Sequence, residues 1–106
     1  MVAASDRTLD TAIAKFKALA DPIRLQVVEL LRQQEMCVCD LCDHIGVAQS
    51  KLSFHLKTLR EAGLLNSRQQ GRWIYYSLNL AAFCELEEYL AEIRRLSPMF
   101  SAKVCK

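Results

Sequence analysis

The sequence predicts one domain of the α+β class, mainly α, in which four helices precede a β-hairpin and a last helix (ααααββα). Apolar residues recur at helical spacing along most of the chain, and this pattern gives way to β-prone runs only between residues 64 and 78. A chain of 106 residues has the length of one domain. We therefore treat residues 1–106 as a single unit.

The first two helices are indicated by apolar stripes and by a start signal between them. Apolar residues at helical spacing predict an amphipathic helix over Thr8–Leu19. Asp21 is a capping residue, and Pro22 after it suits the first position of a helix, so a second helix begins there. The polar residues 33–35 mark its expected end.

Two further helices are each followed by a glycine. The spacing of apolar residues predicts a short helix over Val38–Ile45, and Gly46 suits its left-handed C-terminal cap. A fourth helix is expected over about Gln49–Ala62, and Gly63 ends it in the same way. Its inward-facing apolar positions are expected to be Leu52, Leu56 and Leu59.

The hairpin and the last helix complete the chain. Two β-prone runs, Leu64–Gln69 and Trp73–Leu78, flank a short link that contains glycine, as in a hairpin. Asn79 can cap a last helix, which is expected to end before Pro98. This order of elements is that of a winged helix-turn-helix, in which the second helix of the central pair enters the major groove of DNA.

Basic charge is concentrated in the part of the chain that would read DNA. The net charge is only +2, but residues 47–78 contain five basic residues against one acidic residue. Such an excess is expected of a phosphate-binding surface, although a solvated charged face is the alternative. The candidate DNA contacts are Gln49, Ser50, Lys51, Ser53, His55, Lys57, Arg68 and Arg72.

These candidates have different expected roles. The first four lie near the start of the fourth helix, where base edges are usually met; glutamine suits adenine, and lysine suits guanine or a phosphate. His55 is expected either to reach a base or phosphate or to be an exposed helix residue. Arg72, at the hairpin tip, would enter a minor groove or hold a phosphate, and Arg68 would support contact with the DNA backbone.

A DNA reader of this type is expected to be a symmetric homodimer, because one monomer reads only half a site. Two-fold readers place their recognition helices about 34–36 Å apart. The apolar stripes of the first and last helices would form the interface, unless they bury against the monomer's own core. The interface candidates are Leu9, Ile13, Phe16, Phe83, Leu90 and Ile93.

The five cysteines indicate a reducing environment rather than a disulfide framework, since their number is odd and they are clustered. No apolar run approaches the ~20 residues of a membrane span. The first ten residues lack the regions of a signal peptide. We expect a cytoplasmic protein with no membrane partner.

Three cysteines, Cys37, Cys39 and Cys42, lie within six residues. On a helix, Cys39 and Cys42 are ~60° apart, whereas Cys37 and Cys39 are ~200° apart. Either Cys37 precedes the helix, or ligand binding unwinds its first turn. Three thiolates suit a soft, thiophilic centre, and they saturate three-coordinate As(III) or Sb(III). If Cys84 or Cys105 supplied a fourth ligand, the site could also bind zinc, cadmium or lead. Cys84 is better explained as a buried small hydrophobe.

Residues 35–78 strongly resemble the ArsR/SmtB family of metal-responsive repressors. The stretch Met36–Cys42 is similar to the arsenic-responsive ArsR branch; Gln49–Lys57 and Leu59–Leu65 resemble the recognition-helix signature, and Gly71–Tyr76 resembles the wing. The resemblance implies a homodimeric repressor of an arsenic-resistance operon that binds double-stranded operator DNA when metal-free. Arsenite or antimonite would release it as an inducer held by Cys37, Cys39 and Cys42.

Other functions remain as alternatives. The same cysteines would serve a repressor that senses cadmium, lead, zinc or thiol oxidation. A zinc-stabilised interaction module is a further possibility. An enzyme such as a thiol reductase is disfavoured, because Cys39 and Cys42 lie outside a thioredoxin-like βαβ context and no catalytic constellation accompanies them. We therefore expect no catalytic residues and no catalytic cofactor.

Overall fold

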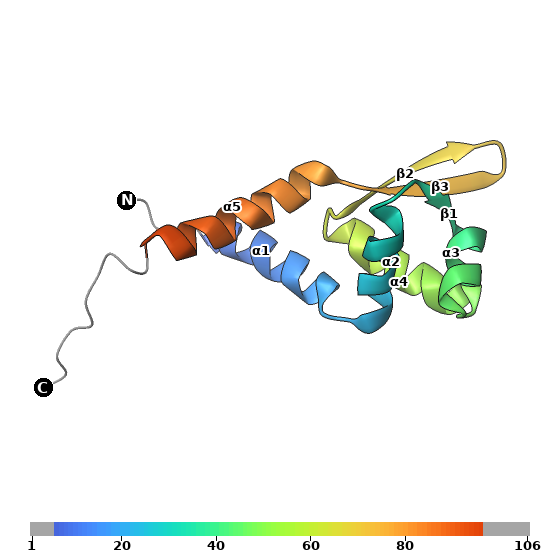
Figure 1. The fold of residues 1–106 in the computed structure, drawn as a ribbon, viewed down its shortest axis with the longest axis horizontal. Helices are drawn as coiled ribbons and strands as arrows, with labels where there is room; N and C mark the ends of the chain where they lie inside the picture. The colour runs from blue at the N-terminus through green and yellow to red at the C-terminus, as the bar shows by residue number, and fades with distance from the viewer. Residues whose placement is uncertain (1–5, 97–106) are drawn as a thin grey trace, which may run out of the picture.

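The computed structural model describes residues 6–96, and within them it confirms the predicted fold of five helices with a small antiparallel sheet (Figure 1). One two-stranded hairpin was expected, but a third, very short strand precedes the third helix. The elements in chain order are α1 (Asp6–Leu19), α2 (Pro22–Leu31), β1 (Met36–Cys37), α3 (Val38–Ile45), α4 (Gln49–Glu61), β2 (Leu65–Gln70), β3 (Trp73–Leu78) and α5 (Leu80–Leu96).

The sheet has the order β1-β3-β2, so β3 is its central strand. In the hairpin, Gln70 pairs with Trp73, which leaves a two-residue turn rather than the three-residue link expected. Gly71 in that turn has a φ of 63°, a conformation that glycine adopts without strain. On the other side of β3, Cys37 pairs with Tyr75 in an antiparallel register.

The core lies where α2, α3 and α4 meet the sheet. As predicted, α4 turns its stripe of leucines inward, and all three are at most 1% exposed. Leu41 from α3 and Val27 from α2 are also fully buried. The largest fully buried side chains are Leu41, Leu52, Leu56, Leu59, Leu64 and Val27.

The structure confirms the capping residues that were predicted at the start of α2 and at the end of α3. Asp21 caps α2 by accepting a hydrogen bond from the backbone N–H of Arg24 at 3.1 Å, and Pro22 is the first helical residue. The end of α3 is closed by Gly46, with a φ of 79°, whose N–H donates to the carbonyl oxygen of Cys42 at 2.7 Å. The largest boundary difference is at α1, which begins at Asp6 rather than Thr8.

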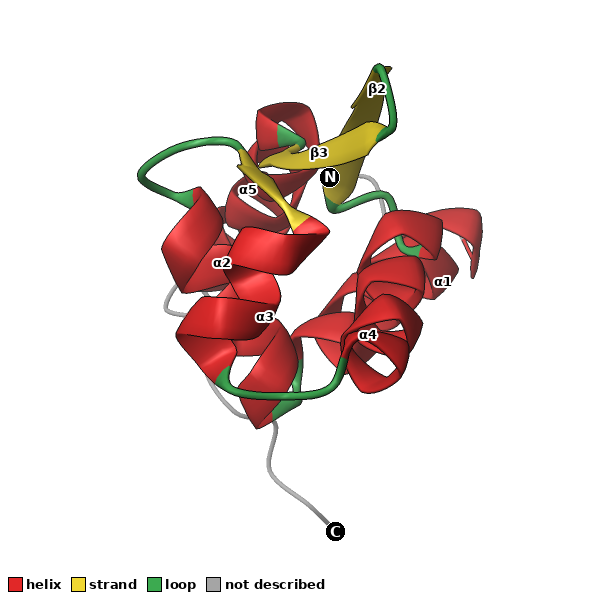
Figure 2. Ribbon diagram, turned by 90° about the vertical axis from the view of Figure 1, so that its right-hand side faces the viewer, coloured by secondary structure: helices red, strands yellow, loops and turns green. Residues whose placement is uncertain are grey.

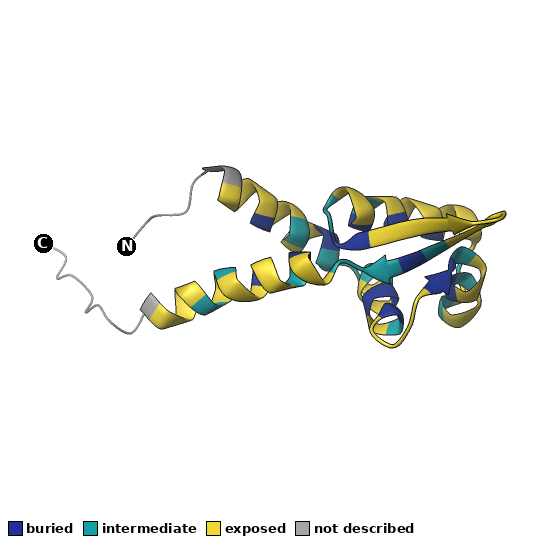
Figure 3. Cartoon of the chain, turned by 90° about the horizontal axis from the view of Figure 1, so that it is seen from above, coloured by how far each residue is buried: buried dark blue, intermediate teal, exposed yellow. Residues whose placement is uncertain are grey.

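Helices α1 and α5 extend together away from the body formed by the other elements (Figures 1 and 3). They touch through Phe16 and Tyr89, whose ring centroids are 6.1 Å apart. The radius of gyration is 17.5 Å, against about 13 Å for a compact domain of 100 residues. No helix within residues 6–96 has the length and apolar character needed to cross a membrane.

Candidate DNA-reading surface and cysteine cluster

The outward face of α4 carries most of the side chains predicted to meet DNA. Helix α4 packs on α3 and α2 (Figure 2). Its leucines are buried in the core. Five predicted contact residues remain exposed along its other side: Gln49, Ser50, Lys51, Ser53 and Lys57. These side chains are free to reach a groove, as a recognition helix requires.

The expectation that His55 faces DNA or solvent is wrong. Its side chain is buried, with 8% exposure. His55 follows Leu52 by three positions, which places it ~60° from that leucine around the helix and within the buried stripe. Arg24 Nη1 donates to His55 Nδ1 at 3.0 Å, so His55 is part of the interior rather than the reading face.

Arg24 connects three helices around this histidine. Apart from its being a basic residue inside an apolar stretch, no local pattern indicates that role. Its Nε donates to the carbonyl oxygen of Ala18 at the end of α1, at 2.6 Å. Asp21 Oδ2 lies 3.8 Å from His55 Nδ1. The backbone N–H of Arg24, and to a smaller extent the charges nearby, hold the pKa of Asp21 below its usual value. This cluster of Asp21, Arg24 and His55 joins the end of α1 to α2 and to α4.

Arg68 does not present a free charge to DNA. Its guanidinium binds both carboxylate oxygens of Glu35, at 2.8 and 2.7 Å, and lies 4.7 Å from the centre of the Tyr75 ring. The hydrogen bond from Arg68 lowers the pKa of Glu35. Because Glu35 precedes β1, the pair joins that segment to the hairpin. Arg68 therefore stabilises the fold, whereas we expected it to support a contact with the DNA backbone.

Arg72 keeps the position predicted for a wing residue. It lies in the turn between β2 and β3, is exposed, and its guanidinium carbon is 5.9 Å from the centre of the Trp73 ring. Within residues 6–96 no ion pair neutralises it. Its charge is therefore available to a phosphate or a minor groove.

Helical geometry allowed two arrangements of the cysteines, and the structure has the one in which Cys37 lies before the helix. Cys37 precedes α3: it lies in β1, is 8% exposed and occupies the N-cap position of the helix. Cys39 is exposed and Cys42 half-buried on α3, and all three are free thiols. Among residues 6–96, no three or more His, Cys, Asp or Glu side chains are placed to hold a metal ion together.

Cys39 nevertheless lies close enough to Cys42 to affect the pKa of the Cys42 thiol. Burial raises the pKa of Cys42, and the neighbouring Cys39 and Asp43 raise that pKa further. The interpretation of Cys84 as a buried hydrophobe is wrong, because it is exposed on α5. Cys105 lies outside the described residues.

The predicted dimer interface is largely open in the single chain. Five of its six side chains are between 37% and 52% exposed: Leu9, Ile13, Phe16, Leu90 and Ile93. Phe83 instead packs against the core of its own chain, which was the alternative to a place in the interface. Figure 3 shows that most of the surface of α1 and α5 is exposed.

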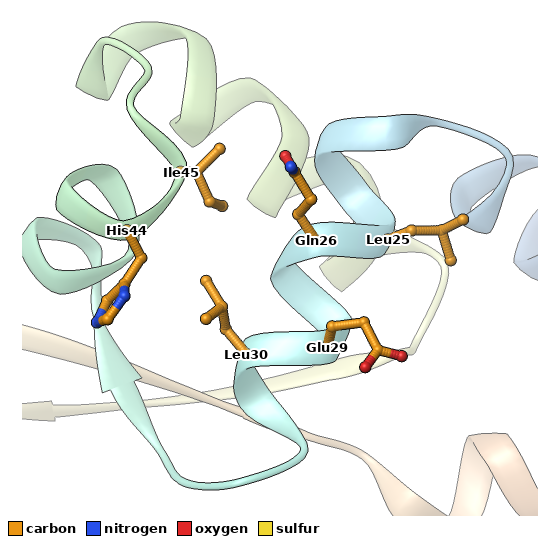
Figure 4. A pocket seen from close by; sticks show the side chains of 6 residues that line it. All are labelled: Leu25, Gln26, Glu29, Leu30, His44 and Ile45. Carbon is orange, nitrogen blue, oxygen red and sulfur yellow. The ribbon is translucent and has the colours of Figure 1, made fainter.

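A hollow of about 310 Å³ lies between α2 and α3 (Figure 4). None of the predicted cysteine ligands or DNA contacts lines it. The side chains around it are Leu25, Gln26, Glu29, Leu30, His44 and Ile45.

Comparison with known proteins shows which family has this fold and sequence. Residues 21–67 match the family described as "Bacterial regulatory protein, arsR family". The chain is 43% identical over 98 residues to the arsenical resistance operon repressor of Escherichia coli (strain K12), a match that covers 80% of this chain and 84% of that relative. The chain belongs to the arsR family. It is therefore a DNA-binding transcriptional regulator of that family and not an enzyme.

Other arsR relatives and solved structures agree. An arsenical resistance operon repressor of Bacillus subtilis (strain 168) is 52% identical over 66 residues, which cover 61% of this chain and 63% of that protein. A crystal structure of an ArsR family transcriptional regulator matches with a TM-score of 0.79 and 26% identity, covering 94% of this chain and 100% of that one. A possible transcriptional regulator for arsenical resistance matches with a TM-score of 0.68 and 31% identity, covering 84% and 98%.

Proposed function

We propose that this chain is a homodimeric repressor of an arsenic-resistance operon, released from its operator when As(III) or Sb(III) binds Cys37, Cys39 and Cys42. The observation that carries the proposal is the position of three free thiols directly before α3 and on it, the helix that packs on the reading helix α4. The relatives described as arsenical resistance operon repressors support the choice of ligand.

The donor set fits such a ligand. Each thiol would give up its proton and replace one hydroxyl of arsenous acid, so that three waters leave and three As–S bonds form. Cys39 and Cys42 are on one side of α3, and the nearby Cys39 contributes to the raised pKa of Cys42. Cys37, directly before the helix, is the thiol that must move to complete the set.

Movement of Cys37 would disturb the wing. Its residue pairs with Tyr75 on β3, and the preceding Glu35 holds Arg68 on β2. Drawing Cys37 toward α3 therefore competes with both contacts. Because ligand and DNA then favour different shapes, each weakens the other's binding by the same factor. A shift from 1% to 99% released needs about 5.5 kcal/mol of differential affinity.

A second copy of the chain is the proposed occupant of the exposed face of α1 and α5. Five large apolar side chains lie open there, and a small domain gains stability by burying such surface. The pairing would also supply the second reading helix that a two-fold operator needs.

The proposal is tested with Cys37→Ser. This variant should bind the operator as the unaltered protein does, because a serine keeps the size of the side chain, but arsenite should no longer release it. Fluorescence anisotropy of reduced protein on a labelled duplex from the region upstream of its gene measures both properties.

Cys84→Ser is the matched control, since Cys84 lies on α5 and should be dispensable for release. Normal release of Cys37→Ser by arsenite would contradict the three-cysteine site. Release of the unaltered protein by peroxide or cadmium, but not by arsenite, would keep the repressor and replace the proposed signal.

A further inference from the structure

We infer that Phe54 reads the methyl group of a thymine in the major groove, and so sets part of the operator sequence that this chain prefers. The inference rests on the proposed binding of operator DNA by α4. Sequence reasoning gave Phe54 no role, because it belongs neither to the polar positions of that helix nor to its inward leucines.

Phe54 lies on the outward side of α4. Its side chain is 63% exposed, whereas the leucines at positions 52, 56 and 59 are at most 1% exposed. Ser50, Phe54 and Lys57 follow one another at steps of four and three residues, so they form one stripe along the helix. That stripe is opposite the buried leucines, and the ring therefore stands among the side chains expected to face DNA.

Single exposed apolar residues are common on protein surfaces, so exposure alone would carry nothing. Here the ring is also held in place. It meets the His55 ring edge-on, with centroids 5.3 Å apart and planes at 72°. His55 is buried and bound by Arg24, so its ring is a fixed support. A supported ring presents a defined apolar surface at little cost in lost side-chain freedom.

One group in the major groove matches the apolar ring of Phe54. Base edges there offer hydrogen-bond donors and acceptors, and the C5 methyl of thymine is the apolar group that phenylalanine side chains contact. A polar base edge beneath the ring would lose water without gaining a partner. The ring should therefore favour thymine over cytosine at one position of each half-site.

Replacing thymine by uracil tests the inference, since it removes only the methyl group. Each thymine of the operator duplex is replaced in turn by uracil, and anisotropy measures the affinity of the unaltered protein and of Phe54→Ala. For the unaltered protein we expect one position per half-site at which uracil weakens binding about fourfold, the factor that corresponds to ~0.8 kcal/mol per buried carbon group. Phe54→Ala should bind thymine and uracil equally at that position.

Two controls keep the outcomes distinct. Glu61→Ala, at an exposed position of the same helix outside the predicted DNA contacts, should retain the response to uracil. Phe54→Gln serves as a second variant that removes the aromatic ring if Phe54→Ala fails to fold. The inference is overturned if no thymine responds to uracil substitution, or if the Phe54 variants respond as the unaltered protein does. If the unaltered protein binds no duplex from its upstream region, the proposed function itself fails and takes the inference with it.

Discussion

Arg24 holds the end of α1, the start of α2 and the middle of α4 together through one side chain. Its bonds to the Ala18 carbonyl and to His55 satisfy polar atoms that would otherwise be enclosed without partners. A buried polar group with a hydrogen-bond partner adds little to the stability of the fold, but one without a partner lowers that stability considerably. The position of α4 relative to α1 thus depends on this residue.

Replacing Arg24 by methionine should lower the free energy of unfolding by roughly 1–3 kcal/mol, because buried acceptors at Ala18 and His55 lose their donor. Urea unfolding followed by circular dichroism measures the change. Arg32→Met is the control: Arg32 pairs with Glu29 on the surface, and such pairs contribute at most ~1 kcal/mol. Equal losses in the two variants would show that the Arg24 cluster has no special importance.

His55 and Phe54 show the limit of reasoning from residue type: the outward placement of His55 was wrong, and Phe54 was given no role. Residue type suggested that the histidine faces outward, but its position three residues after Leu52 places it in the buried stripe. The adjacent phenylalanine is exposed for the complementary reason. Their helix face could have been read from the spacing, whereas the partner that makes burial of His55 tolerable, Arg24, is 31 residues away and has no local signal.

Strand β1 and the Glu35–Arg68 pair fasten the cysteine segment to the wing. The bounds of α3 were predictable, because a turn-forming glycine and regular apolar spacing mark them locally. Strand β1 was not, because its two residues form a strand only by pairing with β3, which lies far along the chain. The same holds for Arg68, whose partner Glu35 precedes it by 33 residues.

The Glu35–Arg68 pair predicts a dependence of stability on pH. Arg68 lowers the pKa of Glu35 in the folded protein from the ordinary value of 4.5, so the pair stabilises the fold above that value. The contribution is lost as the pH falls through the lower, folded-state pKa. Glu35→Gln should therefore have a lower Tm than the unaltered protein at pH 7, and the difference should shrink as the pH falls below 4.5.

Differential scanning calorimetry across that range measures the effect, with Glu29→Gln as a control for a surface carboxylate outside the wing. A difference between Glu35→Gln and the unaltered protein that stays constant from pH 7 to pH 3 would contradict an ionic role for Glu35.

The molecule as a whole consists of a compact reading body and a pair of helices that extend from it (Figure 1). Apolar side chains at the open face of these helices have few neighbours of their own chain to bury them. The proposed dimer would cover them and set the separation of the two reading helices. Affinity for a two-fold operator would then depend on residues remote from DNA.

Leu90→Glu should convert the proposed dimer into a folded monomer, because a carboxylate on α5 would have to lose its water at the interface. Light scattering after size exclusion measures the mass. Operator affinity should fall on the order of a hundredfold, since two linked half-site contacts become one. Leu25→Glu, at 48% exposure against 52% for Leu90, is the matched control on α2. A Leu90→Glu protein that keeps the dimer mass would contradict this interface.

The burial of Cys37 bears on how fast the proposed sensor can respond. Because only 8% of the surface of Cys37 is exposed, β1 would have to open before this thiol could meet the ligand. Exposed Cys39 would make the first bond, and completion would wait for that opening. At high arsenite the rate of release should therefore reach a ceiling set by the protein rather than by the ligand. The chain would have a built-in delay between the arrival of the signal and the start of transcription.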